Sequence, residues 1–135
     1  MRYIDTNPFV RAIANDHAEQ SPRCQEFFDR LGADLEEATT SESVIAEVVY
    51  VLSSKVLFAF SRRGIRARLV PLIMAPGLQL DDKDQYIRAF QLYAETNLHF
   101  VDCLLVAHAE AEDEAVIVSF DRGLDRVPGV RREEP

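Results

Sequence analysis

The sequence predicts one α/β domain, a three-layer α/β/α sandwich around a short, mainly parallel central sheet. Short apolar segments typical of buried strands alternate with longer amphipathic segments typical of helices. At 135 residues, with 47% hydrophobic and 28% charged residues, the chain has the size and composition of one globular domain. Because no repeat, low-complexity stretch or linker interrupts it, we assign residues 1–135 to a single domain.

Capping and proline signals mark the elements of the first part of the chain. Asn7 is a suitable N-cap and Pro8 suits a first helical turn. Ser21 and Pro22 repeat that signal, and Gly32 is a suitable helix end. The elements expected here are a strand over residues 2–5, a helix over 7–14, a helix over 21–31 and a strand over 35–39.

The second part begins with Ser41, a further N-cap candidate. The apolar residues after it have helical spacing, although their β-branched side chains leave a strand as the alternative. Near the end, the continuous run Val116-Ile117-Val118 predicts a buried strand. The elements expected here are helices over residues 41–52, from about 62 to 76, over 81–96 and over 102–112, a strand over 115–120 and a short strand at 130–131.

Charge and composition limit the classes of function. The net charge of −8 argues against broad nonspecific adhesion to nucleic acid or to anionic membranes, but permits a nucleic-acid substrate reached through metal ions and a local basic patch. The most apolar interval, residues 44–60, is too short and too polar for a membrane span. Cys24 and Cys103 lack metal-ligand spacing and are expected as reduced thiols. With no signal peptide evident, we expect a soluble, cytoplasmic protein without membrane association.

Four acidic residues lie in apolar surroundings. Asp5 and Asp121 follow predicted strands, at the sheet edge where open parallel sheets bind ligands. Glu47 and Asp102 lie within apolar helical segments, and their spacing predicts side chains on inward helix faces. Buried carboxylates need a cation or a hydrogen-bond partner. The four acids therefore predict a divalent metal site, and all-oxygen ligands suit Mg²⁺ or Mn²⁺.

Each of these acids also has an ordinary structural explanation. An aspartate after a strand is often a turn residue or an N-cap, and Asp102 is a candidate cap of its own helix. A glutamate with apolar neighbours often lies at the boundary of a helix face. Because the chain has 23 acidic residues, spacing alone leaves both interpretations open.

The local sequences around the four acids resemble the acidic motifs of PIN-domain proteins, with closest similarity to the VapC-like toxins of type II toxin–antitoxin systems. The resemblance covers almost the whole chain. The segments that carry it are YIDTNPFVR at residues 3–11, SESVIAEVVYVL at 41–52, HFVDCLLVAHA at 99–109 and SFDRGLDRVPGV at 119–130.

The resemblance implies a metal-dependent endoribonuclease that hydrolyses RNA phosphodiesters, is inhibited by a cognate antitoxin protein and forms a homodimer. Its motifs imply Mg²⁺, with Mn²⁺ as an alternative. The catalytic and metal-binding residues implied are Asp5, Glu47, Asp102 and Asp121.

Neighbouring residues are candidates for supporting roles. Thr6 or Asn7, and Ser119, are expected to orient a carboxylate or a metal-bound water. Asp125 is either an auxiliary acid or an exposed structural residue. The arginines Arg62, Arg63, Arg66 and Arg68 are either RNA contacts or a solvated or partner-binding helix face, with Arg11 and Arg122 as rival phosphate contacts.

Two other functions remain as alternatives. The first is a catalytically idle PIN-like module that binds RNA or a protein; a degraded site usually loses an acid, and all four are present. The second is a phosphatase with an aspartyl nucleophile at Asp5. It is disfavoured because the residue two positions on is Asn7 rather than a second acid.

Overall fold

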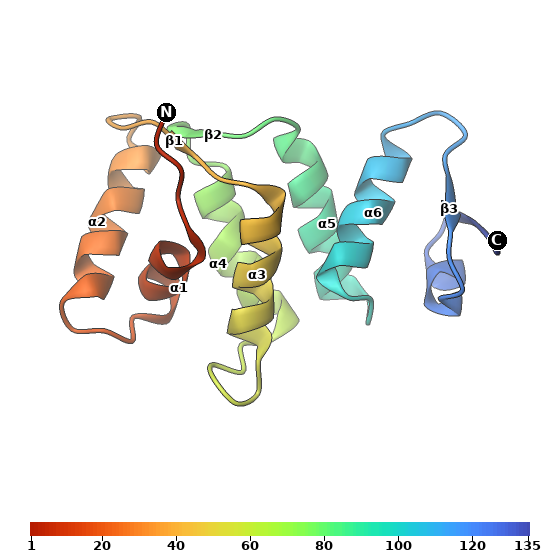
Figure 1. Ribbon diagram of the computed structural model, residues 1–135, viewed down its shortest axis with the longest axis horizontal. Helices are drawn as coiled ribbons and strands as arrows, with labels where there is room; N and C mark the ends of the chain where they lie inside the picture. Colours follow the sequence, from red (N-terminus) through yellow and green to blue (C-terminus); the bar gives the residue numbers. More distant parts are fainter. The chain divides into compact units, whose positions relative to one another are not determined.

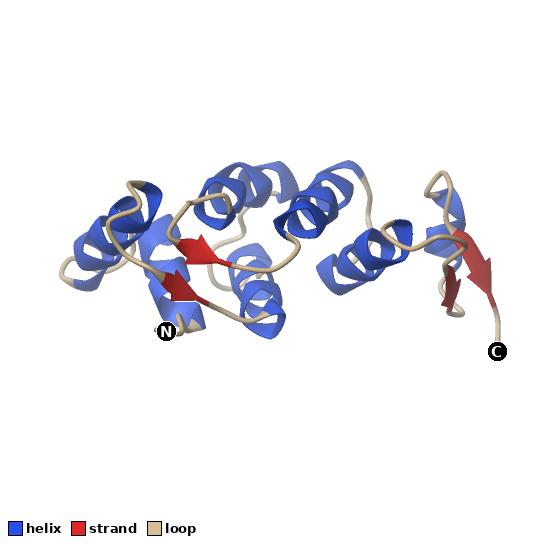
Figure 2. Cartoon of the chain, turned by 90° about the horizontal axis from the view of Figure 1, so that it is seen from above, coloured by secondary structure: helices blue, strands red, loops and turns tan.

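The protein is described by a computed structural model of residues 1–135, which divides into two compact units, Met1–Lys83 and Asp84–Pro135. Each unit combines helices with strands of two or three residues (Figures 1 and 2). Every strand pairing is parallel. The predicted α/β class with short parallel pairing is therefore confirmed.

The first unit builds its sheet from three separate chain segments. Strand β1 pairs with β2 in the register Ala38 to Leu78 and Thr39 to Gln79. On its other side, the N-terminal segment adds a single parallel bridge from Tyr3 to Thr39, which places β1 between the other two segments. The elements are α1 (Thr6–Ala14), α2 (Gln20–Gly32), β1 (Ala38–Thr39), α3 (Glu42–Ser53), α4 (Arg62–Ile73) and β2 (Leu78–Gln79).

Serine caps fix two helix starts in this unit. The Ser41 hydroxyl accepts a hydrogen bond from the Val44 amide at 3.2 Å, and Ser61 accepts one from the Gly64 amide at 3.0 Å. Such caps satisfy amides that have no partner within the helix. Helix α3 buries one apolar stripe, formed by Ile45, Val48, Val49 and Leu52. This segment is therefore a helix, and the alternative of a strand is wrong.

A glycine allows β2 to reach β1. Gly77 lies so close to the end of α2 that a Cβ on it would stand 2.1 Å from the Glu36 carbonyl oxygen and 2.9 Å from that of Leu31. The Gly77 amide donates to Leu31 O at 2.9 Å, and its carbonyl accepts from the Ala38 amide at 3.0 Å. The parallel register of β1 and β2 therefore depends on this close backbone approach.

The second unit begins with two helices that pack through aromatic rings. Phe90 of α5 lies with its ring centroid 4.6 Å from that of Phe100 of α6, and Tyr93 meets the same ring edge-on at 5.7 Å. Arg88 adds two hydrogen bonds to Glu110, at 2.8 and 2.9 Å. The elements are α5 (Lys83–Glu95), α6 (Phe100–Glu110), β3 (Val116–Val118), the 3-10 helix η1 (Arg122–Arg126) and β4 (Arg131–Glu133), with β3 parallel to β4.

Several predicted boundaries were wrong. The strand expected over residues 2–5 is reduced to the bridge at Tyr3. Ser21 does not cap α2, which begins one residue earlier; its buried hydroxyl accepts from the His17 amide at 3.1 Å. The sequence did not predict β2 or η1, because two residues after a proline–glycine pair and one turn of 3-10 helix are too short to show a periodic pattern.

We predict that Gly77→Ala lowers the free energy of unfolding by about 1–3 kcal/mol or more, because the new methyl group overlaps backbone atoms that cannot rotate away. Gly32→Ala is the matched control. A Cβ there meets nothing within 4 Å, so this change should shift stability by no more than about 1 kcal/mol. Urea unfolding measures both variants, and equal midpoints would contradict the prediction.

Candidate active site

One buried threonine connects two of the four predicted acids. The Thr6 amide donates to Asp5 Oδ1 at 2.7 Å, and the Thr6 hydroxyl donates to Glu47 Oε2 at 2.8 Å. Asp5 is the N-cap of α1, whereas Glu47 lies in the middle of α3. Two carboxylates that are 42 positions apart in the chain are thereby tied to the same residue.

Backbone hydrogen bonds on both sides of Ile4 hold this arrangement in place. The Ile4 amide donates to Thr39 O at 2.8 Å, and the Thr40 hydroxyl donates to Ile4 O at 2.8 Å. Ile4 itself is buried. Because Thr39 and Thr40 lead directly into α3, the starts of α1 and α3 are fixed relative to each other, and the Thr6–Glu47 bond follows from that.

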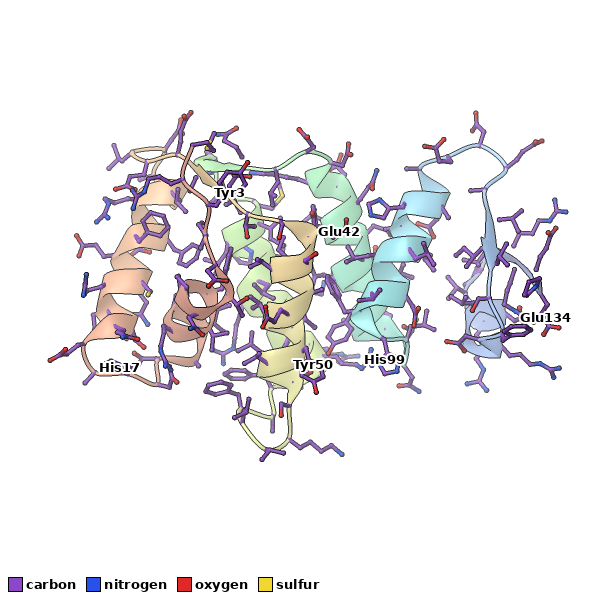
Figure 3. The ribbon with its side chains drawn as sticks, viewed as in Figure 1. Tyr3, His17, Glu42, Tyr50, His99 and Glu134 are labelled. Carbon is purple, nitrogen blue, oxygen red and sulfur yellow. The ribbon has the colours of Figure 1, made fainter.

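The prediction that Glu47 points inward was wrong. The residues that α3 buries lie on the opposite side of the helix, and Glu47 is exposed together with Tyr50, whose exposed fraction is 76% (Figure 3). Asp5 and Asp121 are also exposed, and Asp102 is half-buried. Because none of these carboxylates is fully buried, none needs a cation to compensate for loss of solvent. What the structure offers instead is accessible carboxylate oxygen.

In the second unit, Asp121 is the N-cap of η1. Its Oδ1 accepts from the Gly123 amide at 2.8 Å, and its own amide donates to Ser119 Oγ at 3.0 Å. A Cβ on Gly123 would lie 3.0 Å from Asp121 Oδ1, so this capping loop is closely packed. Ser119 thus orients the backbone of Asp121 rather than its carboxylate.

Asp102 occupies the first turn of α6 and is not the cap of that helix. The N-cap is His99, labelled in Figure 3. Its backbone is extended and its side chain makes no capping hydrogen bond. Asp102 makes no hydrogen bond or ion pair. A carboxylate in a first helical turn is stabilised by the helix dipole, by about 0.3–1 kcal/mol at exposed positions. This acid therefore has both oxygens available.

Asp125 has a structural partner. Arg132 donates two hydrogen bonds to its carboxylate, at 2.8 and 3.1 Å, and a third to Ser119 O at 2.8 Å. The pKa of Asp125 is lowered, chiefly by the hydrogen bonding from Arg132. These bonds join η1 to β4 and to the chain just after β3, which favours the structural role over the auxiliary-acid role.

The arginine cluster lies on α4. Arg63, Arg66 and Arg68 are exposed, and the Arg68 guanidinium stands over the Phe60 ring at 4.6 Å from its centroid. Arg122 is also exposed. The arginine cluster of α4 and Arg122 therefore remain candidate contacts for RNA phosphate or for a protein partner.

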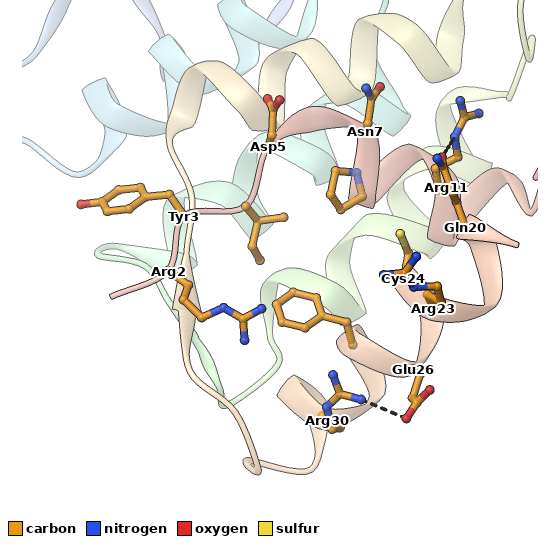
Figure 4. A pocket seen from close by; sticks show the side chains of 13 residues that line it. Arg2, Tyr3, Asp5, Asn7, Arg11, Gln20, Arg23, Cys24, Glu26 and Arg30 are labelled. Atoms are coloured by element: carbon orange, nitrogen blue, oxygen red, sulfur yellow. Dashed lines mark hydrogen bonds and ion pairs between the residues drawn. The ribbon is translucent and has the colours of Figure 1, made fainter.

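The sequence did not predict a pocket in the first unit between the N-terminal segment, α1 and α2 (Figure 4). Its volume is about 660 Å³, and Asp5 and Asn7 line it. Arg23, Cys24 and Phe27 of α2 also line it, and sequence reasoning had given them no role. No motif marks these residues, because only the packing of α1 on α2 brings them beside Asp5.

The donor chemistry of these acids fits a divalent cation. Capping and the Thr6 bond use Asp5 Oδ1 and Glu47 Oε2, which leaves Asp5 Oδ2 and Glu47 Oε1 without protein partners. Carboxylate oxygens are the ligands that Mg²⁺ and Mn²⁺ prefer. Within either unit, no three His, Cys, Asp or Glu side chains gather closely enough to hold a metal ion.

Comparison with protein families identifies the class. The PIN domain family matches residues 2–130, a range that spans both units and all four acids, and the chain belongs to this family. PIN domains are generally nucleases, often act as toxin components and typically use divalent metal ions. No curated protein matches the chain. None of its helices combines the length and apolar character needed to cross a membrane.

We predict that Asp125→Asn weakens the pH dependence of stability at acidic pH. Because the folded-state pKa of Asp125 is lowered, its contribution is present above the unfolded-state pKa, near 4, and is lost as the pH falls through the folded-state value. The stability difference between wild type and Asp125→Asn should therefore be largest at neutral pH and shrink below about pH 4. Thermal unfolding from pH 7 to pH 2.5 measures it, and a constant difference would contradict the assignment.

Proposed function

We propose that the protein is a metal-dependent endoribonuclease that hydrolyses RNA phosphodiesters and is the toxin component of a VapC-like toxin–antitoxin pair. Residues 1–135 form one PIN domain in this proposal. The observation that carries it is the pair of accessible carboxylates, Asp5 and Glu47, held by Thr6 in a member of a nuclease family.

The four acids have a common role in the proposed reaction. Asp5, Glu47, Asp102 and Asp121 hold Mg²⁺ or Mn²⁺ through their carboxylate oxygens. A bound divalent ion supplies a water made nucleophilic at neutral pH and stabilises charge on the phosphoryl oxygens. The protein's own part is to hold these carboxylates in fixed positions, because their oxygens must be oriented before substrate arrives.

Residues that hydrogen-bond the acids hold their carboxylates in position. Thr6 fixes the spacing of Asp5 and Glu47 through its amide and its hydroxyl. Ser119 and the Gly123 amide fix Asp121. Groups that orient metal ligands typically change metal affinity or activity by about 10–100-fold when they are removed.

The proposed partners follow from the toxin assignment. They are the RNA substrate, a cognate antitoxin that inhibits the enzyme, and a second copy of the chain in a homodimer, all in the cytoplasm. Val101 and Leu105, one turn apart on α6, are 63% and 47% exposed. Exposed apolar side chains of this kind support association with a protein surface.

A catalytically idle RNA-binding module is the second candidate. The arginines around the pocket favour RNA binding whether or not the acids are active. Cleavage separates the two functions, because only the enzyme consumes RNA.

We predict that the purified, inhibitor-free protein cleaves single-stranded RNA with Mg²⁺ or Mn²⁺, and that Asp5→Asn and Asp102→Asn each reduce the rate at least ~100-fold, because each removes a charged ligand. Asp29→Asn, an exposed acid of α2, is the matched control and should cleave like wild type. If wild type cuts no RNA with either metal, or if both variants cut RNA as fast as wild type, the proposal is wrong.

We also predict that Thr6→Val raises the Mg²⁺ concentration needed for half-maximal cleavage by about tenfold. Valine keeps the amide that bonds Asp5 but loses the hydroxyl that bonds Glu47. Thr6→Ser retains the hydroxyl and should restore the wild-type metal requirement. A metal titration of cleavage rate measures all three proteins; an unchanged Mg²⁺ requirement in Thr6→Val would show that Thr6 does not position Glu47 for metal.

A further inference from the structure

The pocket of the first unit has the size of a small-ligand site. Its volume of about 660 Å³ lies within the range of about 300–1,000 Å³ that such sites occupy. The N-terminal segment and the start of α1 form one wall and α2 forms the other (Figure 4). Asp5 is one of the residues that line the first wall, so an occupant lies close to a residue of the proposed catalytic set.

The lining of this pocket is positively charged, although the protein as a whole carries −8. It contains four arginines but only two acids, Asp5 and Glu26. Local positive charge of this kind attracts an anionic ligand despite the overall charge. The arginines are Arg2, Arg11, Arg23 and Arg30.

Three of the four arginines already have partners. Arg2 pairs with Glu36 at 2.8 Å, and Arg30 pairs with Glu26 and Glu36, each at 3.0 Å. Arg11 bonds Asp16 and the side chain of Gln20.

Arg23 makes no hydrogen bond or ion pair, and it is exposed. It is therefore the pocket arginine whose charge is not compensated by a neighbouring acid.

Arg11 and Arg23 both line the part of the pocket that contains Cys24. Burial raises the pKa of the Cys24 thiol, whereas the charges of Arg23 and Arg11 oppose that rise. Figure 4 shows Arg11, Gln20, Cys24 and Arg23 following one another along the same side of the pocket. Arg23, whose guanidinium has no protein partner, is suited to contact a phosphate in this part of the pocket.

The same pocket offers a surface for a base. Phe27 is half-buried, and the Arg2 guanidinium lies over its ring at 5.1 Å from the centroid. Unstacked bases of single-stranded RNA stack on aromatic rings and on guanidinium planes. Phosphate-binding and base-stacking groups therefore occur in one cavity.

We propose that this pocket binds one nucleotide of the single-stranded RNA substrate, adjacent to the bond that is cut, with Arg23 on its phosphate and its base against Phe27 and Arg2. The proposal rests on the proposed function, because it places the nucleotide beside Asp5. An acidic peptide also pairs with arginine, but the stacking groups and the neighbouring Asp5 favour a nucleotide.

The binding test uses the full chain in EDTA, where a metal-dependent enzyme leaves the probe intact. Fluorescence anisotropy measures the affinity for a short single-stranded oligoribonucleotide at several salt concentrations. Arg23→Gln should weaken binding about 5–10-fold and reduce the salt slope by about 1, since one phosphate contact is lost. Lys55→Gln removes an equal charge from an exposed position outside the pocket and should bind like wild type.

Cys24 provides an independent readout. It is half-buried in the pocket, while Cys103 is fully buried, so a thiol reagent should modify Cys24 preferentially. The oligoribonucleotide should slow this modification in wild type, and Arg23→Gln should lose most of that protection.

The outcomes distinguish this proposal from the proposed function. If wild type cleaves RNA while Arg23→Gln binds and cleaves equally well, the pocket proposal is wrong and the nuclease stands. If binding depends on Arg23 but no RNA is cut with any metal, the nucleotide-binding role of the pocket stands and the nuclease fails. Protection of Cys24 by an acidic peptide and not by RNA, or loss of binding in Arg63→Gln but not in Arg23→Gln, would also overturn it.

Discussion

The double hydrogen bonding of Thr6 is the constraint on which the candidate site depends. Its amide bonds Asp5 and its hydroxyl bonds Glu47, so one buried residue sets the spacing of two carboxylates on different helices. That geometry exists because Thr39 and Thr40 hold Ile4 from both sides before the chain enters α1. The short parallel pairing around β1 therefore positions the site as well as supporting the fold.

The acids near the two ends of the chain, Asp5 and Asp121, are both helix N-caps. Asp5 caps α1 and Asp121 caps η1, each with one carboxylate oxygen on a backbone amide. Capping and metal binding are compatible, because a carboxylate has two oxygens and the cap uses one of them. The ordinary explanation of these acids as caps is correct, and it also explains how exposed side chains are held in fixed orientations.

Charge is distributed unevenly around this site. The protein is acidic overall, yet the pocket beside Asp5 is lined by arginines. Arg2 and Arg30 pair with glutamates and Arg11 pairs with Asp16, which leaves Arg23 as the pocket arginine without a partner. An acidic centre beside a confined positive pocket fits a substrate that carries phosphate, and limits nonspecific binding elsewhere.

The sequence by itself determined the α/β class, the PIN family and most helices, because capping residues and apolar periodicity are local signals. It also marked the four acids, but it placed Glu47 on the wrong face. The stripe Ile45, Val48, Val49 and Leu52, read alone, places Glu47 on the opposite side of α3. Only the tertiary structure decided the Thr6–Glu47 bond, the β2 pairing that Gly77 permits, and the pocket of Arg23 and Cys24. These features join residues far apart in the chain, and no local pattern encodes such contacts.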